Sequence, residues 1–316
     1  MKYLYVLVSN SADYYSEQCY MSVYSLKLNT PNAFVSLLVD KNTNEYLQQN
    51  FPQLLEAVNE VKAVSLNSVS NKEKSRILKT SMRQHIDGDF LFIDCDTVIC
   101  EDLSEIEKCE YDMGCVLDTH VPIDKHFRKR IIIENYKKCG FNEALCSNYH
   151  FNSGVIFCRD NENTRHFFDN WHSLWKKNFE KQIIIDQPSF NQANMIASNI
   201  IQELQGEWNC QLICGGVKYY RTAKIIHYYA SWGSNNSPFY IDQKNVYEYI
   251  RKNKAISDNL QSRIRNVSSL LEDNNTLVSG NFSRDLLLSI NAHPSIYTLF
   301  SKFLHLVNFK HWFKNG

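Results

Sequence analysis

The chain has 316 residues, of which 44% are hydrophobic, and its 34 Lys and Arg balance its 34 Asp and Glu. This composition is typical of a globular protein and excludes a largely disordered chain, and zero net charge gives no general attraction for nucleic acid. No apolar run approaches the ~18 residues that cross a bilayer, so we expect a soluble or peripheral protein. The ten cysteines lack Cys-x-x-Cys and zinc-finger spacings, which predicts free thiols in a reducing cytoplasm.

Short apolar runs alternate with longer amphipathic segments, which indicates βαβ units and an α/β fold with a mixed, mostly parallel sheet flanked by helices. The expected strands are 3–8, 34–39, 61–66, 90–93, 113–117, 155–158 and 225–229. The expected helices between them are 16–28, 43–50, 53–59, 71–86 and 167–179. Beyond these, residues 246–271 and 284–313 are expected to be helical. The predicted organisation is a catalytic domain of residues 1–245 and a helical C-terminal extension of residues 246–316.

The most informative pattern is an acidic pair that directly follows an apolar strand. Phe90–Ile93 is followed by Asp94, Cys95 and Asp96, and ligands bind at the carboxyl ends of buried parallel strands. Strand alternation turns Cys95 away and leaves both carboxylates facing one crevice, where two like charges are costly without a cation. Carboxylates and phosphate oxygens favour Mg²⁺ or Mn²⁺. The competing interpretation is a solvated strand end, because Asp is common in turns.

This strand and acidic pair resemble the DxD motif of glycosyltransferases with the Rossmann-like GT-A fold, and the wider chain resembles glycosyltransferase family 8. The resemblance covers about residues 1–240, and its further blocks follow in the family's order. They are Arg76 and Lys79 before the motif, Phe151-Asn152-Ser153-Gly154-Val155-Ile156-Phe157, Asp186-Gln187-Pro188 with Asn191, Trp208-Asn209, and Ile225-Ile226-His227.

The resemblance implies a nucleotide-sugar donor, namely a uridine diphosphate sugar, a divalent metal ion, and retention at the anomeric carbon. The implied metal ligands are Asp94, Asp96 and His227, and an imidazole in the set suits Mn²⁺ slightly better than Mg²⁺. The expected donor contacts are Val8, Ser9, Asn10, Tyr14, Arg76, Lys79, Asp94, Cys95, Asn152, Ser153 and Gly154. The expected catalytic or sugar contacts are Asp186, Gln187 and Asp118. The acceptor class is a glycan, glycolipid or glycoprotein.

Each of these residues also has an ordinary structural interpretation. His227 alone could be a buried histidine with satisfied hydrogen bonds. Asp186 before Pro188 could be a helix N-cap, and the segment 152–154 could be a plain loop. Asp118 as a base would leave an inverting mechanism open.

One departure from the family lies just after the late histidine. The family has His-x-x-Gly-x-x-Lys-Pro-Trp, whose lysine contacts the diphosphate, whereas this chain has His227-Tyr228-Tyr229-Ala230-Ser231-Trp232-Gly233. The leaving diphosphate is then short of one cation unless Lys218, Arg221 or Lys224 replaces that lysine.

The C-terminal segment 250–316 carries nine Lys or Arg and four Asp or Glu. Within it, residues 300–314 combine aromatic and basic side chains, which is typical of a helix that lies on a membrane surface. Peripheral contact with the inner membrane face and packing on the catalytic domain are both open interpretations.

Two rival functions remain at the level of sequence. Residues 94–98, Asp-Cys-Asp-Thr-Val, also resemble the signature of haloacid-dehalogenase phosphatases, in which the first aspartate is the nucleophile. That motif normally lies on the first strand, and here three expected strands precede it. The other rival is a catalytically silent module that binds a nucleotide sugar.

Overall fold

The computed structural model describes residues 1–66, 70–212, 214–228, 240–266 and 299. Its strands are β1 (Lys2–Leu7), β2 (Phe34–Asp40), β3 (Glu60–Val64), β4 (Phe90–Ile93), β5 (Thr97–Ile99), β6 (Met113–Cys115), β7 (Val155–Cys158), β8 (Ile201–Glu203), β9 (Cys210–Gln211) and β10 (Ile225–His227). Its α-helices are α1 (Tyr15–Asn29), α2 (Lys41–Asn50), α3 (Pro52–Ala57), α4 (Asn71–Thr80), α5 (Met82–His85), α6 (Lys129–Cys139), α7 (Asn142–Leu145), α8 (Glu162–Glu180), α9 (Gln187–Ile196), α10 (Lys244–Asn253) and α11 (Asp258–Arg265).

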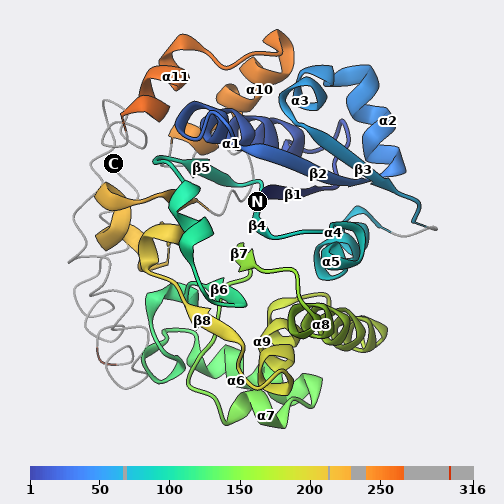
Figure 1. Cartoon of the computed structure of the whole chain (residues 1–316), viewed down its shortest axis with the longest axis vertical. Helices are drawn as coiled ribbons and strands as arrows, with labels where there is room; N and C mark the ends of the chain where they lie inside the picture. The colour runs from blue at the N-terminus through green and yellow to red at the C-terminus, as the bar shows by residue number, and fades with distance from the viewer. Residues whose placement is uncertain (67–69, 213, 229–239, 267–298, 300–316) are drawn as a thin grey trace.

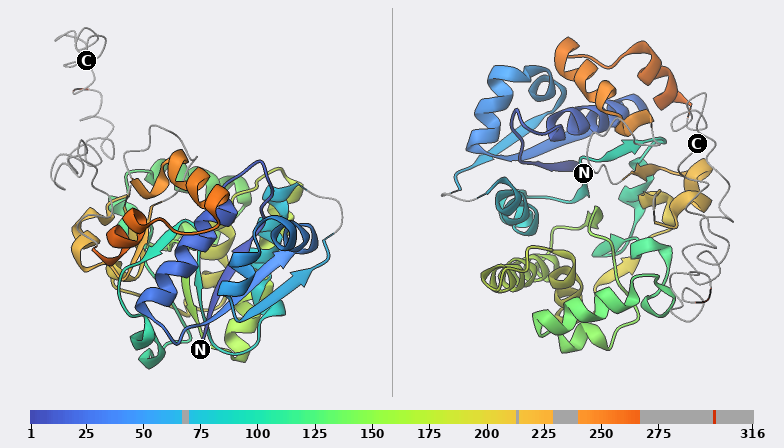
Figure 2. Two further views of the ribbon diagram at one scale, coloured as in Figure 1. Left: turned by 90° about the horizontal axis from the view of Figure 1, so that it is seen from above. Right: turned by 180° about the vertical axis from the view of Figure 1, so that it is seen from behind.

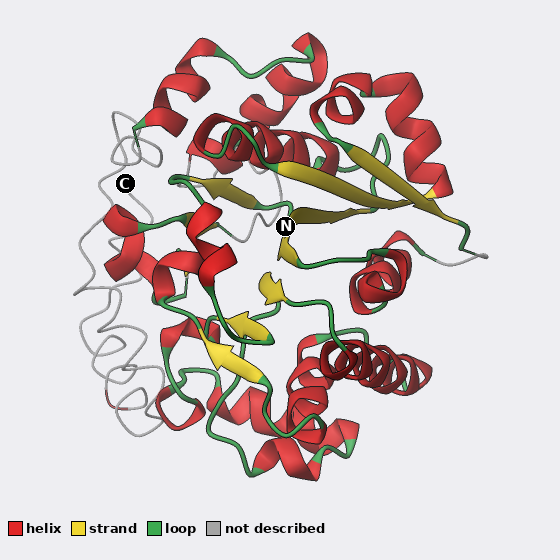
Figure 3. Cartoon of the chain, in the orientation of Figure 1, coloured by secondary structure: helices red, strands yellow, loops and turns green. Residues whose placement is uncertain are grey.

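The centre of the molecule is a seven-stranded sheet with the order β3-β2-β1-β4-β7-β6-β8. Neighbouring strands pair in parallel except at β7, which runs antiparallel to both β4 and β6. The predicted mixed, mostly parallel sheet flanked by helices is therefore confirmed, and Figures 1 and 3 show the helices on its two sides. The carboxyl ends of β1, β4, β6 and β8 lie along one edge of this sheet.

The middle of the sheet is covered on both faces, which explains why β4 and β7 are continuously apolar. Alternate residues of β4 enter different core clusters: Leu91 and Ile93 pack in the cluster that contains α1, whereas Phe90 and Phe92 pack in the cluster that contains α8. All four side chains are fully buried. A strand with no solvent-facing side has no place for a carboxylate before its end.

A second, three-stranded sheet brings the late part of the chain to the end of β4. Its order is β5-β10-β9, with β10 antiparallel to β5 and parallel to β9. The pairing sets His227 opposite Thr97 and opposite Gln211. Because Thr97 follows the acidic pair, this sheet positions the histidine beside Asp94 and Asp96.

The expected helix 71–86 is wrong in one detail, because the structure divides it into α4 and α5. The break falls at Ser81, whose φ of −103° and ψ of 10° are not helical. The Ser81 hydroxyl donates to the carbonyl oxygen of Ile77 over 2.7 Å, which is the local competition that lets serine end a helix.

The C-terminal extension begins with α10 and α11 rather than one helix over 246–271, since Lys254 adopts a left-handed conformation between them, with φ of 54°. Val246, Tyr247 and Ile250 pack in the same core cluster as α1, and Figure 2 shows both helices against that side. The boundary at residue 245 stays a prediction. The expected helix 284–313 and the aromatic–basic segment 300–314 lie outside the described residues, apart from residue 299.

Two further expectations concern compartment. In the part of the chain that the structure describes, no helix combines the length and the apolarity that crossing a membrane requires. All ten cysteines are free thiols, as predicted, while the compartment itself stays a prediction.

Candidate active site

The acidic pair forms a tight turn between β4 and β5. The backbone N–H of Asp94 donates to the carbonyl oxygen of Gly154 over 2.8 Å, and the Thr97 hydroxyl donates to the carbonyl oxygen of Asp94 over 2.8 Å. The Cys95 thiol turns back toward the carbonyl oxygen of Val6 at 3.4 Å. The thiol is thus turned toward β1, but Cys95 lies beyond the end of β4 and lines the same cavity as the two carboxylates, so the expected separation by strand alternation is wrong.

Asp94, Asp96 and His227 offer three ligand atoms that lie within 4.8 Å of one another. The His227 Nε2 atom is 3.3 Å from a carboxylate oxygen of Asp96. The imidazole is 2% exposed, whereas both carboxylates are partly accessible. Two carboxylates and one imidazole at this spacing fit a divalent ion that completes its shell with phosphate oxygens or water. The structure thus brings together the three residues predicted as ligands.

Lys79 provides the charge that balances Asp94 in this structure. Its Nζ atom lies 3.0 and 2.9 Å from the two carboxylate oxygens. Burial, together with the charge of Asp96, still raises the pKa of Asp94. Burial acts in the same direction on Asp96, but the contact with His227 outweighs it and lowers the pKa of that carboxyl. The pair is therefore asymmetric, with Asp96 the more firmly ionised of the two.

Gly154 is required by the position of the imidazole. A Cβ atom added at this residue would lie 2.3 Å from Cε1 and 2.8 Å from Nδ1 of His227. The ring therefore packs directly on the backbone of the segment 152–154, and that segment is more than a plain loop.

Asp186 does not act as a helix N-cap. Its side chain makes no capping hydrogen bond to α9. One carboxylate oxygen is 3.0 Å from Nε of Arg76, and the other accepts from the Ser153 hydroxyl over 3.2 Å. Burial would raise the pKa of Asp186, but the charges of Arg76 and Lys79 outweigh it and lower that pKa. The carboxylate is held ionised between two predicted donor contacts.

Gln187 and Asp118 belong to a buried polar group that the sequence did not reveal. The Gln187 amide nitrogen is 3.1 Å from Nε2 of His150, whose Nδ1 is 2.6 Å from the Tyr136 hydroxyl. Burial lowers the pKa of His150 to about 4, so the ring is neutral at pH 7. Asp118 lies nearby, and His126 Nε2 is 3.0 Å from one of its oxygens.

The hydrogen bonds of Asp118 make it a weak base. Burial would raise its pKa, but the contacts with His126, His150 and Asn152 outweigh that effect and hold the pKa well below its usual range. A carboxylate with so low a pKa has little tendency to take a proton from an acceptor hydroxyl.

A cavity of about 620 Å³ opens beside the acidic pair. It is lined by the end of β1, the first turn of α1 and the first two turns of α4, so it runs from the carboxyl ends of β1 and β4 toward α4. Its lining residues are Val6, Leu7, Val8, Tyr15, Gln18, Asn71, Lys72, Ser75, Arg76, Asp94, Cys95 and Asp96. Of the predicted donor contacts, Val8, Arg76, Asp94 and Cys95 are in this lining.

The other predicted contacts near β1 have structural partners. The Ser9 hydroxyl donates to Asp13 over 2.6 Å, and Asn10 accepts from the N–H of Ala12 over 2.8 Å. The ring of Tyr14 stacks on Tyr247, with 5.5 Å between centroids. The aromatic ring that lines the cavity belongs to Tyr15, one residue along, which begins α1.

The cation that would replace the family's missing lysine is not evident among the named candidates. Lys224 lies 3.0 Å from Glu105, and the Lys218 ammonium lies over the ring of Tyr219 at 4.8 Å. Arg221 is exposed. Residues 229–239, where the family motif departs, lie outside the described residues.

The sequence profile of the family described as Glycosyl transferase family 8 matches residues 88–238. This stretch contains β4, the acidic pair, Asn152, Asp186 and His227. A comparison with curated proteins finds no match.

Solved structures of glycosyltransferases share the fold. The galactosyltransferase LgtC, in a complex with donor and acceptor sugar analogues, is 11% identical with a TM-score of 0.50, covering 83% of this chain and 100% of LgtC. The bifunctional glycosyltransferase WbbM is 15% identical with a TM-score of 0.52, covering 84% of this chain and 51% of WbbM. GlyE of Streptococcus pneumoniae is 15% identical with a TM-score of 0.50, covering 88% of this chain and 66% of GlyE. At these identities the likeness establishes the fold alone.

The sheet order and these solved structures identify the GT-A fold. The acidic pair at the end of β4 lies within residues 88–238, the stretch that matches the profile of Glycosyl transferase family 8. Asp94 follows the fourth strand, not the first, and lies within the stretch that matches glycosyltransferase family 8, so the phosphatase alternative is not supported. The silent-module alternative is tested by the turnover assays below.

Proposed function

We propose that the protein transfers a hexose-type sugar from a uridine diphosphate donor to a glycan, glycolipid or glycoprotein acceptor. Asp94, Asp96 and His227 would hold Mn²⁺, with Mg²⁺ as the alternative ion. The observation that carries the proposal is that two members of this triad, Asp94 and Asp96, line the cavity of about 620 Å³. LgtC, which shares the fold, is described with donor and acceptor sugar analogues.

The ion and the nearby basic residues would together stabilise the negative charge of the diphosphate. When bound, a divalent ion would stabilise negative charge on the leaving diphosphate. Arg76 lines the cavity and Lys79 lies within 3.0 Å of Asp94, so both cations are near the expected phosphates. Positive groups fixed in place before binding stabilise developing charge without reorganising.

Asp186 and Gln187 are suited to orient the sugar. Ionised Asp186 can accept hydrogen bonds from sugar hydroxyls while Arg76 and Ser153 hold its side chain still. Gln187, held at His150, offers an amide beside it. Fixing the sugar in this way lowers the entropic cost of reaching the transition state.

The environment of Asp118 favours retention over inversion. An inverting reaction needs a base to activate the acceptor hydroxyl, and the depressed pKa of Asp118 makes it a poor one. This property of Asp118 supports the retaining assignment.

Isothermal titration calorimetry tests the shared metal and diphosphate site. We expect UDP to bind at least about 10-fold more tightly with Mn²⁺ than with a chelator, because the phosphates complete the metal shell. Uridine, which lacks the phosphates, is the matched control and should bind equally under both conditions. Identical UDP affinities would contradict the proposal. Mn²⁺-dependent release of UDP from a panel of UDP-hexoses then identifies the sugar.

A further inference from the structure

A chain of hydrogen bonds links the backbone of Gly154, just before β7, to the side chain of His227. The first hydrogen bond of this chain can have only one direction. The backbone N–H of Gly154 can only donate, and it donates to Oδ1 of Asn152 over 2.9 Å. The other end of that amide, Nδ2, is 2.9 Å from a carboxylate oxygen of Asp118, which can only accept. Both neighbours therefore require the same orientation of the Asn152 side chain.

The orientation of Asn152 determines that of Asn209. Oδ1 of Asn152 is 3.0 Å from Nδ2 of Asn209, so the second amide presents its N–H to the first. Its own oxygen then faces Nδ1 of His227 at 3.0 Å. A flipped Asn209 would set two acceptor oxygens against each other at this distance. Because Asn209 is fully buried, water could not compensate for that loss.

The last link is the histidine itself. An oxygen 3.0 Å from Nδ1 requires that this nitrogen carry the proton in the neutral ring. Nε2 is then the nitrogen that faces Asp96, at 3.3 Å, and it is the ring atom left to meet either that carboxylate or a metal ion. Only this tautomer can ligate a metal ion at the triad without first moving a proton.

We propose that Asn209 and Asn152 are positioning residues that hold His227 as the Nδ1–H tautomer with Nε2 directed at the metal site. The metal part of this inference rests on the proposed function. In this inference Asp118 holds the side chain of Asn152 and does not act as a base. The sequence blocks that contain Asn152 and Asn209 then both act on the side chain of His227. Hydrogen-bond partners of ligating histidines typically change metal affinity about 10- to 100-fold.

Three variants separate positioning from general damage. Asn209→Leu removes both hydrogen bonds at similar size and should weaken Mn²⁺ binding, measured by calorimetry in the presence of UDP, by about 10- to 100-fold. Asn209→Asp keeps an acceptor for the proton on Nδ1 but sets two acceptor oxygens together at Asn152, so its Mn²⁺ affinity should fall less than that of Asn209→Leu. Asn178→Leu is the matched control. Asn178 is 1% exposed and donates to Ser189 over 3.1 Å, outside the chain described above, and its loss should leave Mn²⁺ affinity unchanged.

The tautomer is also measured without metal. Nitrogen NMR of ¹⁵N-histidine-labelled, chelator-treated protein should show His227 protonated at Nδ1, and the Asn209→Leu variant should show a mixture of tautomers. Wild-type protein without a proton on Nδ1 of His227, or equal Mn²⁺ affinity in Asn209→Leu and wild type, would overturn the inference. Failure of the wild type to bind Mn²⁺, with the expected NMR result, would count against the proposed function and leave the tautomer assignment supported.

Discussion

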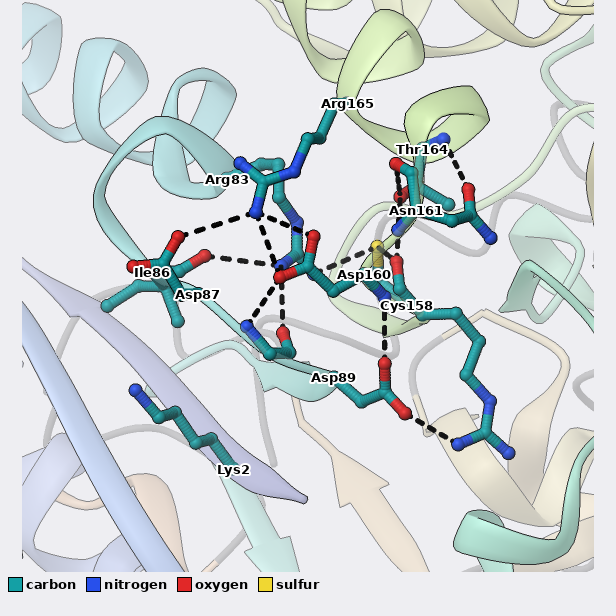
Figure 4. A network of polar contacts seen from close by, with 12 residues as sticks. Lys2, Arg83, Ile86, Asp87, Asp89, Cys158, Asp160, Asn161, Thr164 and Arg165 are labelled. Atoms are coloured by element: carbon teal, nitrogen blue, oxygen red, sulfur yellow. Dashed lines mark hydrogen bonds and ion pairs between the residues drawn. The ribbon is translucent and has the colours of Figure 1, made fainter.

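Partly buried aspartates lie at both ends of β4, but the two ends differ in how far the protein's own cations and donors match the carboxylate charges. At the amino end, Arg159 lies 2.6 Å from Asp89, and Arg165 lies 2.7 Å from Asp160. Arg83 adds a third guanidinium, 3.5 Å from Asp160. Figure 4 shows Arg83 and Arg165 gathered around Asp160, with Asp89 beside them.

Backbone groups complete the amino-end network. The N–H of Gly88 donates to Asp160 over 2.6 Å, and the N–H of Asp160 donates to Asp89 over 2.8 Å. Burial would raise the pKa of Asp89, but these contacts and the Arg159 hydrogen bond outweigh it and lower that pKa. The carboxylates here are matched by cations and donors on the protein itself.

The carboxyl end is incomplete by comparison. Asp94 and Asp96 lie close together, the pKa of Asp94 is raised, and Lys79 is the cation in contact with it. Carboxylates that lack enough cationic partners in the protein can bind a cationic ligand. The four residues of β4 therefore separate two kinds of charged group. The network around Asp89 and Asp160 is suited to stabilise the fold, and the cluster of Asp94, Asp96 and His227 is suited to bind a ligand.

The largest expected effect is on activity at the carboxyl end. Asp96→Asn removes the charge of one proposed metal ligand. We expect a loss of about 4 kcal/mol of transition-state stabilisation, which lowers kcat/KM about 1000-fold. The free energy of unfolding without metal should fall by no more than about 1 kcal/mol, because the variant loses the contact with His227 but also the repulsion from Asp94. UDP-sugar turnover and urea unfolding measure the two quantities. Near-normal turnover would make the acidic pair structural.

The amino end should show the opposite pattern. Arg83→Met removes a guanidinium that is 2% exposed, lies 4.2 Å above the ring of Phe90 and donates to the carbonyl oxygen of Gly88 over 2.8 Å. Breaking a buried ionic contact should lower the free energy of unfolding by about 3 kcal/mol, while kcat/KM at a permissive temperature stays within about twofold.

The control for that variant is Arg130→Met. Arg130 is 88% exposed and pairs with Glu134 on the same helix, so its loss should change stability by less than about 0.5 kcal/mol. Equal destabilisation by the two arginine variants would mean that the buried network contributes no more than a surface pair.

The sequence predicted the features that are local in the chain. The strands at 90–93 and 155–158 were placed at their observed bounds because both are buried on two faces and therefore wholly apolar. The acidic pair was also predictable, since Asp94 and Asp96 share a strand end, whereas His227 was grouped with them only through the resemblance to family 8. The break at Ser81 was missed because it depends on one side-chain hydrogen bond.

The remaining features of the site depend on tertiary neighbours. Nothing in the order of residues says that Tyr14 meets Tyr247 while Tyr15 reaches the cavity. The hydrogen bond from Asn209 to Asn152 joins residues 57 positions apart. Its signal was present only as the Trp208-Asn209 block, which the pattern of the chain did not connect to His227.

The smallest expected effect is a difference in pH dependence between the two ends, measured by urea unfolding in chelator between about pH 3.5 and 6. The lowered native pKa of Asp89 contributes stability above its unfolded pKa of about 4, and this contribution is lost as the pH falls through the native value. The free energy of unfolding of the wild type should therefore exceed that of Asp89→Asn by about 1 kcal/mol at pH 6, and this difference should shrink in acid.

The raised native pKa of Asp94 has the opposite effect on stability, because the native state takes up the proton more readily than the unfolded state. Relative to Asp94→Asn, the wild type should gain stability as the pH falls toward 4. Gaps that change in the same direction for both variants would contradict the contrast between the two ends of β4.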